Sequence, residues 1–201
     1  MTLAGENTEN QIRNAAREVF ISRGFEGARM QEIADHAGIN KALLHYYFRS
    51  KEKLFDAVFS EVAADLFPAM KQVIEAELGI KEKITFFIKI YLKILHENPF
   101  IPAFVINTLN TNPQRFLKYI KKSGINPMYL QKQIDNEAAR GLIRQVKAEH
   151  LVVNIIAMCI FPFVARPIVQ NIFDMTDGEY QQYLESRQNE IIDFVLKSLT
   201  V

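Results

Sequence analysis

The sequence predicts an all-α fold, and three observations favour it. Glycine and proline are scarce, at 8 and 7 of 201 residues. Apolar residues recur at intervals of three and four, and no run alternates apolar with polar residues for long enough to suggest a sheet. The hydrophobic share of 49% is enough for a sizeable core. We therefore expect one or two domains built from helices.

The first helix is expected to run from Thr8 to Gly24. Thr8 and Gln11 have the spacing of a capping box, in which each side chain satisfies a free amide of the first turn. Apolar residues then follow at helical spacing as far as Phe20. Gly24 can adopt the left-handed conformation that ends a helix, with Phe25 folding back on Phe20.

Residues 30–48 predict two short helices joined by a tight turn. Met30, Ile33 and Ala34 form one apolar edge of the first helix, and the second is expected from about Asn40 to Phe48. Gly38 suits the turn between them, and Ala34 is small enough for the point where the helices cross. Two short helices joined by a glycine turn form a helix-turn-helix.

A long connecting helix should follow, capped by Ser50 and ending at Gly79. Pro68 lies inside it, so we expect a kink near Phe67, because proline removes a backbone hydrogen bond and crowds the preceding turn. We divide the chain into a helix-turn-helix domain at residues 1–50, a connecting helix at 51–78, and a C-terminal helical domain at 79–201.

The remaining helices are placed by capping signals. Asn98-Pro99, Asn112-Pro113 and Asn126-Pro127 each favour a helix start, since asparagine caps a helix and proline suits its first position. A strongly apolar helix is expected to begin near Lys147. A long amphipathic helix should close the chain, with an apolar stripe that ends at Leu199.

The charge of the chain indicates a basic surface that is local. The net charge is +1 and the pI is about 7.8, which gives no overall signal for nucleic acid or membrane. Residues 40–53, however, hold four cations and one acidic residue. Taking 100° per residue, the second short helix turns Ala42, His45 and Tyr46 outward, and Lys41 and Leu43 flank this outward face. This face could contact phosphates and base edges of a major groove, although four surface cations can equally be a solvated face.

The stretch "GFEGARMQEIADHAGINKALLHYYFRSKEKLF" closely resembles the N-terminal domain of the TetR family of transcriptional regulators. The resemblance covers about residues 8–60, and beyond residue 60 only the general helical plan is similar. It implies that the DNA-binding residues are Gln31, Lys41, Ala42, Leu43, His45, Tyr46 and Lys51. Lys51 resembles the phosphate-binding lysine of the family. Leu43 stands where a small or hydroxylated residue is usual, and His45 replaces the first of the usual tyrosines.

The resemblance also implies that residues 1–50 are a DNA-binding domain and that residues 79–201 are a ligand-binding and dimerisation domain. It implies a homodimer that binds a pseudo-palindromic operator and is released by a small, largely apolar effector. The dimer would form through the helix at about residues 148–165 and the C-terminal helix, although these could also pack only within one chain. The effector would bind among the aromatic residues of the middle region. The predicted pocket residues are Phe87, Tyr91, Phe104, Asn107, Thr108 and Tyr129.

Other classes of protein are less well supported by the sequence. The four histidines have no metal-ligand spacing, and no nucleophile elbow or phosphate-binding glycine loop appears, so we predict neither an enzyme nor a metal or cofactor site. A DNA-binding activator or architectural protein without an effector stays open as an alternative.

The sequence favours a cytoplasmic protein. The first ten residues lack a secretion signal, and the single cysteine, Cys159, is expected to be a small buried residue. The apolar stretch from Leu151 to Val169 is interrupted by Asn154, Pro162 and Arg166, so a buried helix is favoured over a membrane span.

Overall fold

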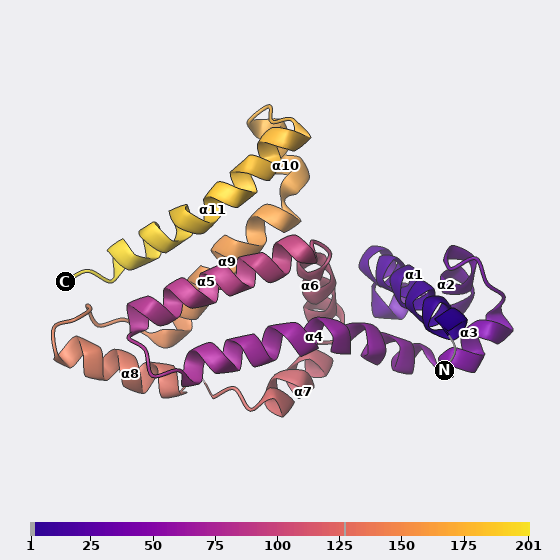
Figure 1. The fold of residues 1–201 in the computed structure, drawn as a ribbon, viewed down its shortest axis with the longest axis horizontal. Coiled ribbons are helices and arrows are strands. Elements are labelled where there is room, and N and C mark those ends of the chain that lie inside the picture. The colour runs from indigo at the N-terminus through magenta and orange to yellow at the C-terminus, as the bar shows by residue number, and fades with distance from the viewer. Residues whose placement is uncertain (1–2, 127) are drawn as a thin grey trace. The chain divides into compact units, whose positions relative to one another are not determined.

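The computed structural model describes residues 3–126 and 128–201, and within them the regular structure is helical (Figure 1), which confirms the all-α prediction. The helices are α1 (Leu3–Gly27), α2 (Met30–His36), α3 (Lys41–Tyr47), α4 (Lys51–Glu75), α5 (Ile80–Glu97), α6 (Ile101–Thr111), α7 (Pro113–Ser123), α8 (Met128–Ala139), α9 (Ala148–Val164), α10 (Arg166–Ile172) and α11 (Asp177–Ser198).

The helices form two compact units. The N-terminal unit comprises residues up to 65 together with residues 103–119, and the C-terminal unit comprises residues 66–102 and 120–201. Helices α4, α6 and α7 therefore each contribute to both units. The boundaries predicted at residues 50 and 78 separate functional regions and not compactly packed units, and they stay predictions.

The N-terminal unit is held together by packed aromatic rings from α1, α4 and α6. The ring centroids of Phe20 and Phe55 are 5.1 Å apart, and those of Phe55 and Phe104 are 5.2 Å apart. Phe25 and Phe59 complete this aromatic cluster, and all five side chains are at most 8% exposed. Such rings bury large apolar areas, so α6 is part of the core beneath the helix-turn-helix.

The helix-turn-helix has the predicted turn. Gly38 has a φ of 63°, in the left-handed region that glycine adopts without steric cost. The Gln11 side chain of α1 donates to the carbonyl oxygen of Ala37 at 2.8 Å. Ala34 is fully buried, as its expected place at the helix crossing requires. The turn is thus fixed both by its own backbone and by a contact from α1.

Several helix ends differ from the sequence predictions. Helix α1 begins at Leu3, ahead of Thr8, and its helical backbone is interrupted at Gly24, where φ is 69°. Helix α4 ends at Glu75, short of Gly79, and contains Pro68 within its helical span. The kink expected at that proline stays a prediction.

The three Asn-Pro pairs have different outcomes. Asn112-Pro113 begins α7 as predicted. The prediction for Asn98-Pro99 was wrong, because Asn98 ends α5 by donating its amide to Ile94, and α6 begins only at Ile101. Asn126 accepts a hydrogen bond from the amide of Met128 at 3.0 Å, as a capping residue does. Pro127 lies outside the described residues.

In the C-terminal unit, side chains of α11 donate hydrogen bonds to backbone carbonyls of α9 near Pro162. Pro162 has no amide hydrogen, so the carbonyl of Met158, one turn earlier, lacks its usual donor. The Arg187 guanidinium donates to that carbonyl at 3.5 Å, and the Tyr180 hydroxyl donates to the carbonyl of Pro162. Side chains of α11 thereby replace hydrogen bonds that α9 cannot make itself.

Cys159, on the same helix α9, is fully buried, as predicted. Burial raises the pKa of its thiol to about 12, so the side chain is a neutral, apolar part of the core.

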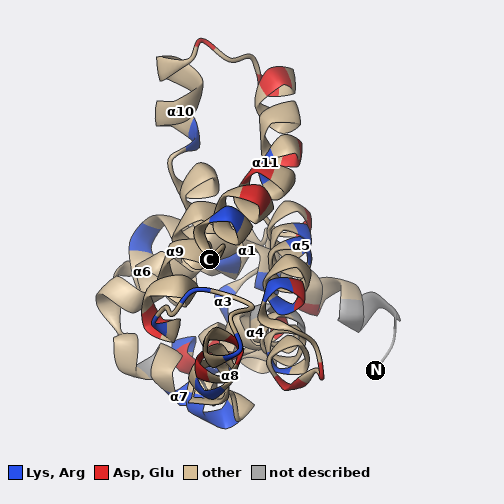
Figure 2. Cartoon of the chain, turned by 90° about the vertical axis from the view of Figure 1, so that its left-hand side faces the viewer, with Lys and Arg blue, Asp and Glu red and all other residues tan. Residues whose placement is uncertain are grey.

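Helix α11 begins as a capped amphipathic helix. Thr176 and Glu179 form a capping box, and Glu179 accepts from the amide of Thr176 at 2.8 Å. The acidic residues Asp177 and Glu179 lie in its first turn, which carries red bands in Figure 2. Negative charge there favours the positive end of the helix dipole.

Among the described residues, no single helix is long and apolar enough to cross a membrane. Helices α9 and α10 together reach the length and composition of a span, but they are bent by 75° where they join.

Replacing Gly38 by valine is expected to lower the stability of the protein. A side chain in the left-handed conformation costs roughly 1–2 kcal/mol, which corresponds to a fall in melting temperature of about 2–8 °C for a chain of this size. The nearest atom to an added Cβ is 4.0 Å away, so the cost is one of conformation and not of crowding. Thermal unfolding followed by circular dichroism measures it.

Gly178→Ala is the matched control, because Gly178 lies in α11 and an added Cβ meets nothing within 4 Å. Its melting temperature should stay unchanged or rise. Equal losses in the two variants would contradict the role given to Gly38.

Candidate nucleic-acid interface

Helix α3 presents a continuous exposed face above a buried anchor. Leu44 is fully buried, whereas Tyr46 is 78% exposed and Leu43 is 37% exposed. The five residues of α3 that were predicted to face DNA are all exposed, namely Lys41, Ala42, Leu43, His45 and Tyr46. Their placement is that of a recognition helix, and their contacts with DNA stay predictions.

The start of α3 is fixed by Asn40. Its side-chain oxygen accepts a hydrogen bond from the amide of Leu43 at 2.8 Å, which satisfies one free donor of the first turn. The helix has seven residues. An α-helix with its side chains is about 10–12 Å in diameter and a B-DNA major groove is about 12 Å wide, so α3 can enter the groove.

Gln31 lies exposed on α2, the other helix of the motif. Its side-chain amide donates to the carboxylate of Asp35 at 2.8 Å, which orients it along the helix surface. Helices α2 and α3 pack against each other, so Gln31 and the outward residues of α3 belong to one rigid element.

The ammonium group of Lys51 makes two hydrogen bonds within the protein. It donates to the carbonyl oxygens of Glu26 and Ala28 at 3.2 and 3.1 Å. It also lies over the ring of Phe25, 4.6 Å from the centroid. An ammonium has three donors, so one is left for a phosphate. The structure gives Lys51 a second role, which is to join the start of α4 to the end of α1 and to Ala28, which follows it.

Other exposed cations surround the motif and were not among the predicted residues. Arg29 is exposed at the N-cap position of α2, and Arg49 and Lys53 are exposed on either side of Lys51. In the sequence, Arg29 could have been found from its position directly before Met30, where the first short helix was expected to begin.

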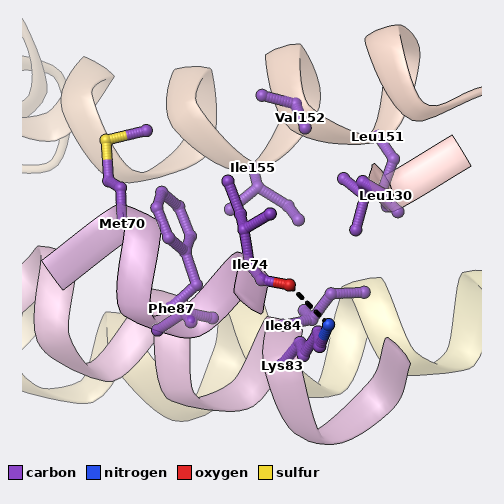
Figure 3. A pocket seen from close by; sticks show the side chains of 10 residues that line it. Met70, Ile74, Lys83, Ile84, Phe87, Leu130, Leu151, Val152 and Ile155 are labelled. Atoms are coloured by element: carbon purple, nitrogen blue, oxygen red, sulfur yellow. Dashed lines mark hydrogen bonds between the residues drawn. The ribbon is translucent and has the colours of Figure 1, made fainter. Parts of the chain in front are cut away.

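A cavity lies in the C-terminal unit, between α4, α5, α8 and α9. Its volume is about 80 Å³, and Figure 3 shows its lining side chains. Its lining residues are Met70, Val73, Ile74, Lys83, Ile84, Phe87, Leu130, Leu151, Val152 and Ile155. A cavity with such walls fits an apolar ligand.

The six predicted pocket residues are not brought together. Phe87 lines the cavity, and the ring of Tyr91 stacks on the ring of Phe87, with their centroids 5.3 Å apart. Phe104, Asn107 and Thr108 belong to the N-terminal unit, where Asn107 donates to the carbonyl of Ile21. Tyr129 lies on α8 and is 60% exposed.

Of the described residues that line the cavity, Lys83 alone is charged. Its ammonium donates to the carbonyl of Ile74 at 2.6 Å, near the end of α4 (Figure 3). Burial lowers the pKa of this lysine, and Glu137 acts in the opposite direction. Lys83 therefore closes the end of α4 and turns its charge away from the cavity.

The described residues contain no group of three histidine, cysteine, aspartate or glutamate side chains that could hold a metal ion.

Residues 12–58 match the sequence model described as "Bacterial regulatory proteins, tetR family". The chain is 28% identical to the transcriptional activator FasR of Mycolicibacterium smegmatis over 56% of this chain and 52% of FasR. It is 28% identical to the transcriptional repressor NicS of Pseudomonas putida over 78% of this chain and 76% of NicS. The chain thus spans about half of FasR and three quarters of NicS.

The fold is also similar to that of the transcriptional regulator FadR of Bacillus subtilis in complex with stearoyl-CoA. The TM-score is 0.62 at 18% identity, and the match covers 94% of this chain and 98% of that one.

Replacing Lys51 by alanine is expected to destabilise the N-terminal unit by about 1–2 kcal/mol, because two charge-assisted hydrogen bonds and a cation–π contact are lost. Lys53→Ala removes an exposed cation of the same helix and should change the free energy of unfolding by no more than about 0.5 kcal/mol. Denaturant titration without DNA measures both. Equal stabilities would show that Lys51 does not join these segments.

Proposed function

We propose that this chain, which belongs to the tetR family of bacterial regulatory proteins, is a transcriptional repressor. It binds a pseudo-palindromic operator as a homodimer and is released by a small, largely apolar effector. The observation that carries the proposal is that Leu44 is buried on one side of α3, while the residues predicted to contact DNA are exposed.

The exposed residues of α3 suit contact with a major groove. Lys41 and Tyr46 can donate to phosphates, and Leu43 can touch the methyl group of a thymine. Arg29 and Arg49 add exposed positive charge on either side of the motif. Phosphate contacts provide affinity and orient the protein, while the base edges read by α3 provide specificity.

A second copy of the chain is needed because one short helix reads only a few base pairs. Two recognition helices in a dimer must lie about 34–36 Å apart to reach successive major grooves. Helices α9 and α11 expose large apolar side chains, including Val153 at 64%, Phe161 at 62% and Phe194 at 66%. Apolar residues exposed in this number are typical of an interaction surface. Their position supports dimerisation through these two helices.

The cavity of the C-terminal unit is the proposed effector site. The last turns of α4 form one of its walls, and α4 is a single helix that begins directly after the recognition motif. An effector that prefers the conformation unable to bind DNA would lower operator affinity, and a coupling of ~1–3 kcal/mol gives about a 5- to 150-fold effect. The stearoyl-CoA bound by FadR supports the idea that this fold can hold an apolar ligand.

Activation is the second candidate for the sign of regulation, because FasR is an activator. We propose repression because the match to the repressor NicS extends over more of the chain.

Lys41→Ala is expected to weaken binding to operator DNA and to flatten its dependence on salt. Each lost phosphate contact lowers the slope of log affinity against log salt by about 0.9. Lys81→Ala removes an exposed lysine of α5 and should leave the slope unchanged. Fluorescence anisotropy with a genomic fragment selected by the protein measures both slopes. If wild-type protein selects no double-stranded fragment, the proposed function is wrong.

Phe194→Glu is expected to convert the protein to a monomer, because it places a charge in the proposed interface. Phe86→Glu is the matched control, since Phe86 is 50% exposed on α5, outside α9 and α11. Sedimentation velocity at micromolar concentration distinguishes the two states. A dimer that survives Phe194→Glu and Val153→Glu would rule out this interface.

A further inference from the structure

The cavity of the C-terminal unit is continued by a second, narrower space along the seam between α4 and α5. That space is lined by Leu66, Ala69, Met70, Val73, Phe87, Ile90, Tyr91 and Ile94, and it is too tight to admit a water molecule. Met70, Val73 and Phe87 line both spaces. The two therefore lie end to end, and residues 66–74 of α4 extend roughly 12 Å at 1.5 Å per residue.

Phe87 lies where the two spaces meet. Its ring is close to Met70 at one end of the cavity, while Leu130 and Leu151 are at the other end (Figure 3). Beyond it, Tyr91 stacks on the same ring at an interplanar angle of 23°. The side chain of Phe87 thus closes the cavity on the side of Tyr91.

Apart from Lys83, the described side chains that line the cavity are apolar and therefore suit hydrocarbon. Lys83 directs its ammonium to the carbonyl of Ile74. A volume of about 80 Å³ leaves room for several methylene-sized groups, given that a water needs roughly 10–15 Å³ on the same measure. Apolar cavities of this kind stay dry and bind apolar molecules.

The end of the cavity away from Phe87 adjoins a polar groove. Val152 lines the cavity and also an open groove of about 710 Å³ between α8 and the start of α9. The groove carries polar and charged side chains, namely Gln131, Gln145, Lys147 and Glu149. A ligand could therefore keep a polar head in the groove while its tail lies in the cavity.

We propose that the effector is a straight-chain acyl compound whose tail enters the cavity past Val152, and that Phe87 sets the longest tail that binds. The apolar cavity beside a polar groove fits an apolar tail with a polar head, and the tail stops at Phe87 because the space beyond this ring admits no water molecule. The inference rests on the proposed function, because it names the class of effector for that same site.

The test measures binding of straight-chain carboxylates from four to twelve carbons to DNA-free protein by isothermal titration calorimetry. Affinity for the wild type should rise about fourfold with each added methylene up to a limiting length, and then stop rising. In Phe87→Ala the limit should move to chains at least two carbons longer. Phe86→Ala, which truncates the neighbouring, half-exposed ring, should keep the wild-type limit.

Two results would overturn the inference: an affinity that does not depend on chain length, or the same limit in wild-type protein and in folded Phe87→Ala. Should circular dichroism show that Phe87→Ala is unfolded, Ile155→Phe provides the opposite change. The added ring fills the cavity, so the gain per methylene should disappear, and its persistence would also overturn the inference.

Operator binding by the same protein preparations distinguishes failure of this inference from failure of the proposed function. The bound carboxylate should lower the affinity for DNA, and an unchanged affinity would overturn its role as effector. Protein that binds DNA but no carboxylate contradicts only the present inference. Protein that binds carboxylates but no DNA contradicts the proposed function.

Discussion

The direction in which the recognition helix faces depends on the turn at Gly38. With a φ of 63°, this residue lets the amide of Ile39 reach the carbonyl of Ala34 at 3.0 Å and the amide of Gly38 reach that of Asp35 at 3.1 Å. The turn fixes α3 against α2, and Gln11 ties it to α1 through the carbonyl of Ala37. Because Leu44 is buried on one side of α3, His45 and Tyr46 are directed outward.

The core of the N-terminal unit joins α1 and α4 to segments of α6 and α7. Phe104 of α6 packs on Phe55 of α4, and the Tyr119 hydroxyl of α7 donates to Asp56 at 3.0 Å. Asn107 approaches α1 so closely that a Cβ at Gly24 would lie 2.9 Å from its side-chain oxygen. A displacement of these segments of α6 or α7 would therefore change the packing of α1 and α4.

The sequence predicted the helix-turn-helix well because its requirements are local. Gly38 and Asn40 act within a few residues of their positions in the chain, so their roles follow from residue type and spacing. Pairing between distant segments could not be read in this way. Phe87 and Phe104 both lie at helical spacing in apolar helices, yet only Phe87 lines the cavity, because α4, α5, α8 and α9 meet there. Lys51 shows the same limit, since its contacts with Glu26 and Ala28 join segments more than twenty residues apart.

Methylation interference on a DNA fragment selected from the genome tests the central claim most directly, because guanine N7 lies in the major groove. Two recognition helices about 34–36 Å apart predict two clusters of interfering guanines whose centres are roughly 10–10.5 base pairs apart, related by a two-fold axis. Only one cluster, or contacts confined to the minor groove, would contradict the account.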